Sequence, residues 1–222
     1  MKLSIIIPVL DEAKTMGTLL NALQSFRERG HEVIVIDGGS GDNSVAIASP
    51  RCDLCQVTPA GRAIQMQAGA DVANGDVLWF LHADSRVPAG ADEMISQVLD
   101  HAGWGGFPVR LSGSQRLLRI VERLMNIRSR LTGILTGDQG IFIERQIFDQ
   151  VGGFQAIPLM EDIDLSTRLK RVTRPAFAGG VLETSSRRWE SHGTVRTIVR
   201  MWLLRLAFSV GVPAHYLANH YV

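Results

Sequence analysis

Short apolar stretches alternate with amphipathic stretches over about the first 110 residues, and this pattern constrains the fold more than any other feature. Residues 3–9 form an almost unbroken β-branched run, as expected of a central strand buried on both faces. We expect further strands at 33–36, 54–57 and 77–81, and helices at 15–29, 62–72 and 91–99. This alternation predicts right-handed βαβ units and therefore an α/β fold with a mostly parallel sheet.

The second half of the chain is less regular. We expect strands at 104–111 and 140–143, a basic amphipathic helix at 117–131 and a helix at 161–171. The sequence contains no linker or internal repeat, so we predict one domain over residues 1–190, followed by a helical tail over 191–222. Arginines and a Gly211–Pro213 break interrupt the apolar part of the tail, which argues against a membrane span. The tail is expected to pack on the domain or on a membrane surface.

Composition excludes several classes of protein. The formal net charge is +1, so no overall field favours nucleic acid. Cys52 and Cys55 have C-x-x-C spacing, but a zinc ribbon would need a second pair, and we expect reduced thiols. The apolar run at the N-terminus is too short for a signal peptide. These features predict a cytoplasmic protein, or a peripheral one held at the inner membrane through its tail.

Acidic side chains follow three of the expected strands. Asp11 and Glu12 come after the first strand, Asp37 after the second and Asp84 after the fourth. Any one of them alone is better explained as a helix cap. Ligands of open α/β sheets bind beyond the carboxyl ends of the strands, and three such ends with acids favour a shared binding site. Oxygen ligands there suit Mg²⁺ or Mn²⁺ shared with phosphate.

Two further groups of polar residues could have either a structural or a functional role. Glu161, Asp162 and Asp164 crowd the start of an expected helix, where they either favour the helix dipole or repel one another enough to raise the pKa of a catalytic base. Asp138 and Gln139 follow a glycine-bearing turn and precede an expected strand, so they either face the acceptor or belong to a turn that binds no ligand. The glycine-rich turn at 38–41 follows the second strand and lacks the spacing of a dinucleotide-binding fingerprint.

The order and spacing of these motifs resemble the family 2 glycosyltransferases of the GT-A fold. The motifs are Ser4 to Pro8, Asp11-Glu12, Ile36 to Asp42, Gly61-Arg62, His82-Ala83-Asp84, Gly152 to Phe154 and Glu161-Asp162. Closer details resemble a small bacterial subgroup labelled as arsenosugar-biosynthesis-type glycosyltransferases: residues 136–140, 158–162 and 186–189.

The resemblance implies a role for each matching residue. The nucleotide-binding residues would be Pro8, Asp11, Glu12, Asp37, Gly39, Arg62, His82, Ala83 and Asp84, with Asp37 at the base. Asp84 and His82 would hold the divalent cation, and Glu161 and Asp162 would form the catalytic pair, with Asp162 as general base. The acceptor or diphosphate side would comprise Asp138, Gln139, Arg187, Arg188 and Trp189.

The chain departs from the family pattern at two positions. His82 stands where a first carboxylate is expected, and histidine ligates Mn²⁺ better than Mg²⁺. Ser185 stands where processive relatives have glutamine, which argues against polymer synthesis.

The resemblance implies metal-dependent transfer, with inversion, of a sugar from a nucleoside diphosphate sugar to an acceptor hydroxyl. One alternative is a non-catalytic, nucleotide-binding family member, which the His82 substitution motivates. A sugar nucleotidyltransferase is a weaker alternative, because the loop after the first strand has no glycine before Gly17. Aromatic residues of the tail leave a lipid acceptor, a membrane surface or a second copy of the chain as alternative partners.

Overall fold

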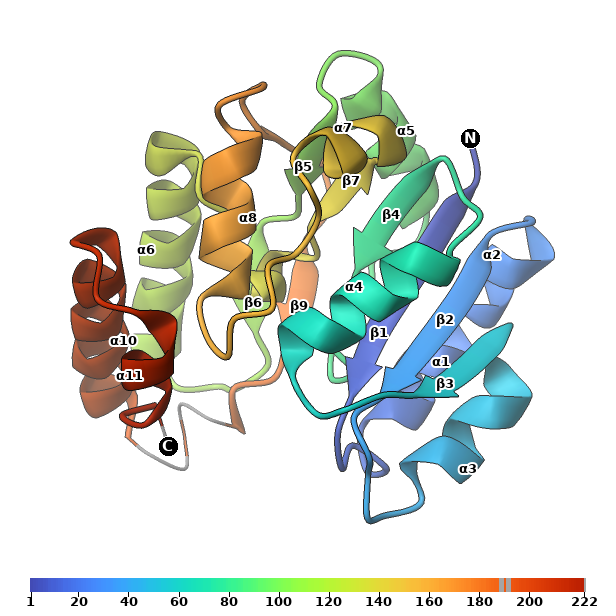
Figure 1. The fold of residues 1–222 in the computed structure, drawn as a ribbon, viewed down its shortest axis with the longest axis horizontal. Coiled ribbons are helices and arrows are strands. Elements are labelled where there is room, and N and C mark those ends of the chain that lie inside the picture. Colours follow the sequence, from blue (N-terminus) through green and yellow to red (C-terminus); the bar gives the residue numbers. More distant parts are fainter. Residues whose placement is uncertain (188–189, 191–192, 222) are drawn as a thin grey trace.

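A seven-stranded sheet runs through the middle of the protein (Figure 1). The computed structural model describes residues 1–187, 190 and 193–221. The sheet has the order β3-β2-β1-β4-β7-β5-β8. These strands are β1 (Leu3–Val9), β2 (Glu32–Asp37), β3 (Leu54–Val57), β4 (Val77–Phe80), β5 (Trp104–Gly106), β7 (Phe142–Glu144) and β8 (Ala176–Phe177).

Strand direction places the ends of β1, β2 and β4 together. β1 pairs in parallel with both β2 and β4, and β2 pairs in parallel with β3. β7 is antiparallel to its neighbours β4 and β5, whereas β5 and β8 are parallel. The predicted mostly parallel α/β sheet is therefore confirmed, and the loops that follow β1, β2 and β4 leave the sheet at one edge.

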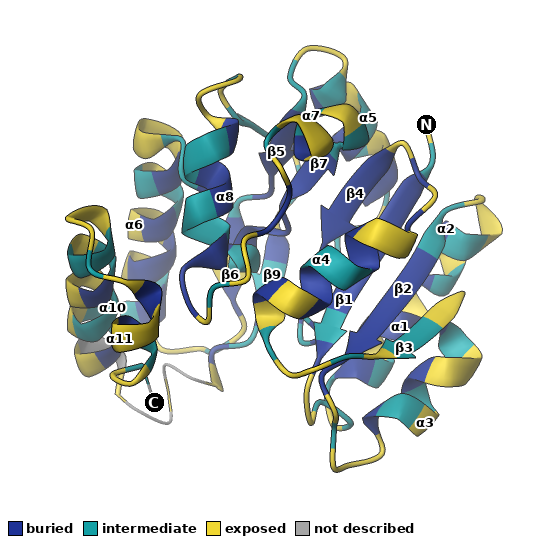
Figure 2. Ribbon diagram, viewed as in Figure 1, coloured by how far each residue is buried: buried dark blue, intermediate teal, exposed yellow. Residues whose placement is uncertain are grey.

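Alternate residues of the central strands enter two different cores. Ile5 and Ile7 of β1 pack toward helices α1 (Met16–Ala22), α2 (Gln24–Glu28) and α5 (Ala91–Leu99). Ile6 packs on the opposite face, toward α4 (Arg62–Val72), α7 (Arg145–Gln150) and α8 (Glu161–Leu169). The central strands are buried on both faces (Figure 2), as the continuous apolar runs predict.

Two expected elements are divided in the structure. The helix expected at 15–29 becomes α1 and α2, because Leu23 between them has a ψ of −7°. The strand expected at 104–111 becomes β5 and β6 (Val109–Leu111), and β6 pairs with β9 (Leu182–Thr184) in a separate two-stranded sheet. Pro108 lies at the break and has no N–H to continue a ladder.

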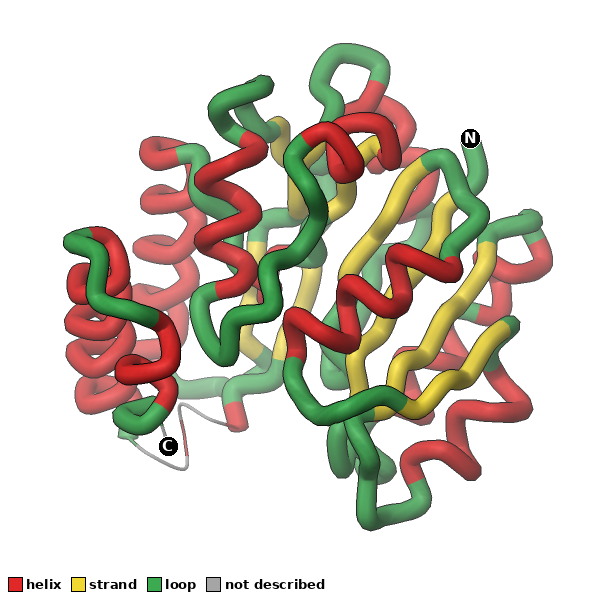
Figure 3. Tube along the Cα trace, viewed as in Figure 1, coloured by secondary structure: helices red, strands yellow, loops and turns green. Residues whose placement is uncertain are grey.

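Three helices stand together beyond β6 and β9 (Figure 3): α6 (Arg116–Thr132), α10 (Thr194–Ser209) and α11 (Ala214–Ala218). Leu204 and Leu217 of the tail pack on Leu159 and Met160, just before α8. The tail thus lies against the domain. Within the described residues, no helix is both long enough and apolar enough to cross a membrane. Short elements complete the chain: α3 (Ser44–Ala48) and the 3₁₀ turns Ser49–Arg51 and Gly137–Gln139.

Both cysteines of the C-x-x-C pair are free thiols near β3. Burial raises the pKa of Cys52 to about 11 and also raises the pKa of Cys55. A thiol with a raised pKa is a poor nucleophile and a poor redox group.

The close approach of α4 to the sheet depends on Gly69. A β-carbon at this position would lie 2.4 Å from Cγ2 of Ile6, whereas one at Gly17 of α1 would meet only Ile47, at 3.9 Å. We predict that Gly69→Ala lowers the free energy of unfolding by about 1–3 kcal/mol through overpacking. Gly17→Ala, the matched control, should raise it by about 0.5–1 kcal/mol, because alanine favours helix. Urea denaturation of both variants checks this, and equal effects would contradict the packing account.

Candidate functional site

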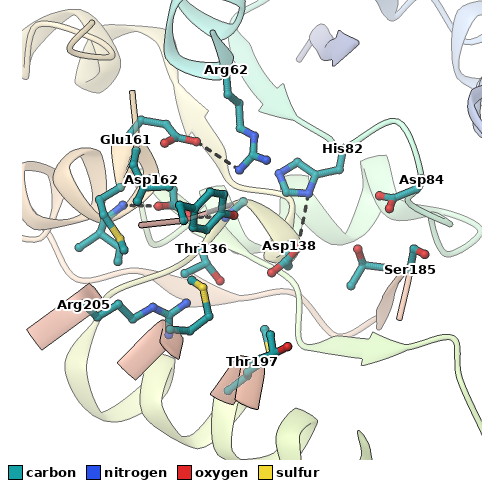
Figure 4. Close-up of a pocket in the computed structure, with 18 of the residues that line it drawn as sticks. Arg62, His82, Asp84, Thr136, Asp138, Glu161, Asp162, Ser185, Thr197 and Arg205 are labelled. Atoms are coloured by element: carbon teal, nitrogen blue, oxygen red, sulfur yellow. Dashed lines mark hydrogen bonds and ion pairs between the residues drawn. The ribbon is translucent and has the colours of Figure 1, made fainter. Parts of the chain in front are cut away.

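A cavity of about 870 Å³ opens where β1 and β4 end. One wall consists of residues at the strand ends and at the start of α4: Pro8, Leu10, Glu12, Arg62, His82, Ala83 and Asp84. The opposite wall is formed by α6 and α10. Between the walls lie Thr136, Gly137, Asp138, Glu161 and Asp162 (Figure 4). The structure therefore brings Asp84 and Asp162 into one cavity.

The loops after β1 and β2 are tied to each other. Ser40 Oγ donates to Asp37 Oδ2 at 2.5 Å, and the same Oγ lies 2.9 Å from the backbone N–H of Asp11. Gly41 N–H donates to Asp11 Oδ1 at 2.8 Å. The other oxygen of Asp37 accepts from the N–H groups of Gly39 and Ser40, each at 2.8 Å. Asp11 and Asp37 thus shape the two loops, and neither lines the cavity.

Glu12 and Asp84 line the strand-end side. Glu12 Oε1 accepts from Arg187 at 3.1 Å, and its Oε2 accepts from Thr15 Oγ1 at 2.6 Å. Burial raises the pKa of Asp84; the nearby His82 opposes that rise, and the negative charge of Glu12 adds to it. A cation bound beside Asp84 would favour its charged form.

His82 reaches the middle of the cavity floor. Its Nδ1 lies 3.4 Å from Asp138 Oδ1, and its Nε2 is buried and makes no hydrogen bond within the described part of the chain. A β-carbon at residue 137 would lie 2.5 Å from that Nε2, so only glycine leaves room for the imidazole. Gly137 falls within residues 136–140, but its contact with His82 was not predictable, because the two residues are far apart along the chain.

Asp162 lies at the base of the cavity, in the first turn of α8. Its Oδ2 accepts from the N–H of Gly137 at 2.8 Å, and its Oδ1 accepts from the N–H of Ile163 at 2.7 Å. Burial, reinforced by the neighbouring Glu161, raises the pKa of Asp162 to about 6. A carboxylate with this pKa can accept a proton near neutral pH, which is what a general base requires.

Glu161 is buried, and its Oε1 lies 3.4 Å from Arg62 Nη1. Although burial disfavours the charged form of Arg62, the carboxylates around it raise its pKa, with Glu161 the largest contributor. Arg62 therefore keeps its positive charge, and it places that charge in the cavity beside the two acids.

The remaining predicted residues divide into two groups. Gln139 is fully buried and points away from the cavity: its Oε1 accepts from Ser129 Oγ at 2.7 Å and from the Thr136 N–H at 3.2 Å. Gln139 closes the 3₁₀ turn rather than facing an acceptor, because a capping box uses its side chain. Arg188 and Trp189 lie outside the described residues.

The donor set at Asp84 suits a cation that arrives with phosphate. Within the described residues, no three His, Cys, Asp or Glu side chains come close enough to hold a metal ion by themselves. Mg²⁺ and similar ions in nucleotide enzymes are commonly bound by one or two carboxylates together with substrate phosphates. Asp84, with His82 nearby, fits such a shared site and does not fit an all-protein cage.

Sequence comparison decides the family. Residues 4–144 match the family model described as glycosyl transferase family 2. The chain belongs to this family. Its relatives include an uncharacterized glycosyltransferase of Mycobacterium tuberculosis, 33% identical over 148 residues, which covers 61% of this chain and 55% of that protein. The chain thus spans about half the length of this relative. The arsenosugar-biosynthesis subgroup stays a prediction.

Two solved structures share the fold of this family 2 chain. TarS of S. aureus (residues 1–349), in complex with UDP-GlcNAc, has a TM-score of 0.67 and 17% identity, covering 83% of this chain and 58% of its own. Glucosyl-3-phosphoglycerate synthase of Mycobacterium tuberculosis, in complex with Mn²⁺, UDP and phosphoglyceric acid, has a TM-score of 0.67 and 18% sequence identity. The match covers 96% of this chain and 79% of the synthase chain. The predicted GT-A fold is confirmed.

The raised pKa of Asp162 makes stability depend on pH. The folded state holds its proton more tightly than the unfolded state does, so this group stabilises the protein at low pH and loses that contribution as the pH rises through about 6. Asp162→Asn cannot titrate. We predict that the stability of the variant relative to the wild type increases between about pH 4 and pH 7. Urea denaturation of both proteins across this range measures the difference, and a difference that does not change with pH would contradict the shift.

Proposed function

We propose that the protein transfers a sugar from a nucleoside diphosphate sugar to an acceptor hydroxyl. The observation that carries this proposal is the position of Asp162: a carboxylate with a raised pKa stands between a strand-end wall that bears Asp84 and a second wall formed by α6 and α10. A base between two walls suits a reaction in which a donor and an acceptor meet from opposite sides.

The donor is assigned to the strand-end wall. Pro8, Glu12, Ala83 and Asp84 lie there, at the carboxyl ends of neighbouring strands where nucleotides bind in open α/β sheets. The related fold of TarS binds UDP-GlcNAc, and the glucosyl-3-phosphoglycerate synthase binds UDP with Mn²⁺. Asp11 and Asp37 support this wall through the loops they tie together. Direct contact between Asp37 and the base stays a prediction.

The chemical step is a single displacement at the anomeric carbon. Asp162 takes the proton of the acceptor hydroxyl, and the acceptor oxygen forms a bond to that carbon. The bond from the carbon to the diphosphate oxygen breaks, and the electron pair leaves with the nucleoside diphosphate. Because the new bond forms on the face opposite the one that breaks, the anomeric configuration inverts.

The negative charge that develops on the leaving diphosphate must be neutralised by nearby positive charge. Asp84 and His82 would hold a divalent cation there, and a cation at that place neutralises the charge of the departing group. Arg62 contributes a fixed positive charge beside Asp162, and Arg187 contributes another at the mouth of the cavity. Guanidinium groups match phosphate geometry, so both are placed to steady the diphosphate.

The test begins with a thermal-shift screen of nucleoside diphosphates with and without Mn²⁺, which identifies the preferred base. Nucleoside diphosphate release from the corresponding sugar donor is then measured. We predict that Asp162→Asn lowers this rate by about 100-fold or more, and that Asp84→Asn removes its dependence on the divalent cation.

Asp164→Asn is the matched control, because Asp164 lies in the same helical turn but binds Arg168 at 2.6 Å and does not line the cavity. Its rate should stay close to that of the wild type. Full activity of Asp162→Asn, or tight nucleotide binding without any turnover in the wild type, would contradict the proposal. Release of pyrophosphate from a nucleoside triphosphate and a sugar phosphate would identify a nucleotidyltransferase instead.

A further inference from the structure

The wall of the cavity opposite the strand ends is strongly apolar. It is lined mainly by side chains from α6 and α10: Val121, Leu124, Met125, Ile127, Leu131, Ile198, Met201 and Trp202. Several of these also lie at the molecular surface, where Ile127 is 54% exposed, Trp202 63% and Leu131 80%. The apolar lining therefore continues from the cavity to the outside. Exposed apolar surface of this kind marks a binding site for an apolar group.

Two arginines stand in the same wall. Arg128 of α6 and Arg205 of α10 both line the cavity, and the Nε of each is buried without a hydrogen-bond partner among the described residues. Arg128 Nη2 donates to its neighbour Ser129 at 3.2 Å. Burial lowers the pKa of Arg128, although Asp162 and Asp138 oppose this. A buried guanidinium donor without an acceptor is costly, and an anion in the cavity would remove that cost.

Arg205 lies on the side of the cavity away from Arg62 (Figure 4). Arg62 enters the cavity from the side of α4 and is paired with Glu161, whereas Arg205 enters from the opposite side (Figure 4). Asp162 lies between them. The proposed function uses Arg62 and Arg187 for the donor diphosphate, which leaves Arg128 and Arg205 available to an anionic group of the second substrate.

We propose that the acceptor is an anionic amphiphile, which carries a phosphate-type group and a long hydrocarbon chain. This rests on the proposed function. The acceptor hydroxyl lies at Asp162, the anionic group binds Arg128 and Arg205, and the chain runs between α6 and α10 and leaves past Leu131 and Trp202. A neutral acceptor would offer the two guanidinium groups only uncharged, weaker hydrogen-bond acceptors, and a small anion would leave the apolar lining exposed to water.

The test uses three probes below their micellar concentrations: dodecyl phosphate, inorganic phosphate and dodecyl maltoside. Binding to the full-length protein is measured by calorimetry, in the presence of Mn²⁺ and the nucleoside diphosphate selected by thermal shift. Dodecyl phosphate is expected to bind at least about tenfold more tightly than either of the others, because only it combines a charge-assisted hydrogen bond with chain burial.

Variants separate the two contributions. Arg205→Gln should weaken binding of dodecyl phosphate by about tenfold and leave dodecyl maltoside unchanged, since it removes one charged donor. Leu124→Asp should weaken both alkyl probes. The matched control is Ile120→Asp on the same helix, because Ile120 is 53% exposed and does not line the cavity. This control should bind dodecyl phosphate like the wild type.

Three results would overturn the inference. If inorganic phosphate binds as tightly as dodecyl phosphate, the site recognises only the anion and the alkyl chain contributes nothing to binding. Dodecyl maltoside that binds equally well, or an Ile120→Asp variant as weak as Leu124→Asp, would show non-specific adsorption to apolar surface. Absence of binding by any alkyl probe, while the nucleoside diphosphate still binds, would refute the acceptor site and leave the proposed function standing.

Discussion

The carboxylate of Asp162 is held by two backbone N–H groups in surroundings that oppose its ionisation, and the organisation of the cavity depends on this balance. Gly137 and Ile163 fix the two oxygens, while burial and Glu161 raise the pKa. The hydrogen bonds favour the charged form, yet burial dominates. Met160, which precedes this turn, has a φ of +68°, a strained conformation for a residue other than glycine. Leu204 of α10 and Leu217 of α11 pack in one apolar cluster with Met160, so the tail covers the start of the helix that carries the candidate base.

The cavity has two chemically different halves, each built by a different part of the chain. The strand-end half is polar, and its shape comes from parallel pairing of β1 with β2 and β4, followed by the hydrogen bonds that tie their loops together. The helical half is apolar with arginines, and it comes from α6 and the tail. This division suits the proposed pairing of a charged nucleotide donor with a chemically different acceptor. Asp162 lies where the halves meet.

Much of the sheet was predictable from sequence, because a strand buried on both faces leaves a continuous β-branched run such as residues 3–9. The helices at 62–72 and 91–99 were predicted with the boundaries that the structure has, and a glycine precedes each of them. The division at Pro108 was missed, because the apolar run continues across it and the pairing of the second strand with β9 depends on residues far away in the sequence.

The site was less predictable, since local motifs do not reveal which side chains meet. Asp84 and Asp162 share the cavity, as expected, whereas Gln139 turns inward because its neighbours Ser129 and Thr136 use its oxygen. From the sequence, Arg205 was predicted only to interrupt an apolar tail. Arg128 was predicted only to belong to a basic helix. Their common position depends on α10 packing beside α6, which no spacing within either helix encodes.

The most direct measurement is a crystal structure of the Asp162→Asn variant with an intact nucleoside diphosphate sugar and Mn²⁺. We predict that the diphosphate lies beside residue 84 and that the anomeric carbon faces residue 162, with the leaving oxygen on its far side. A donor bound along α6 and α10, or a leaving oxygen on the same side as residue 162, would contradict it.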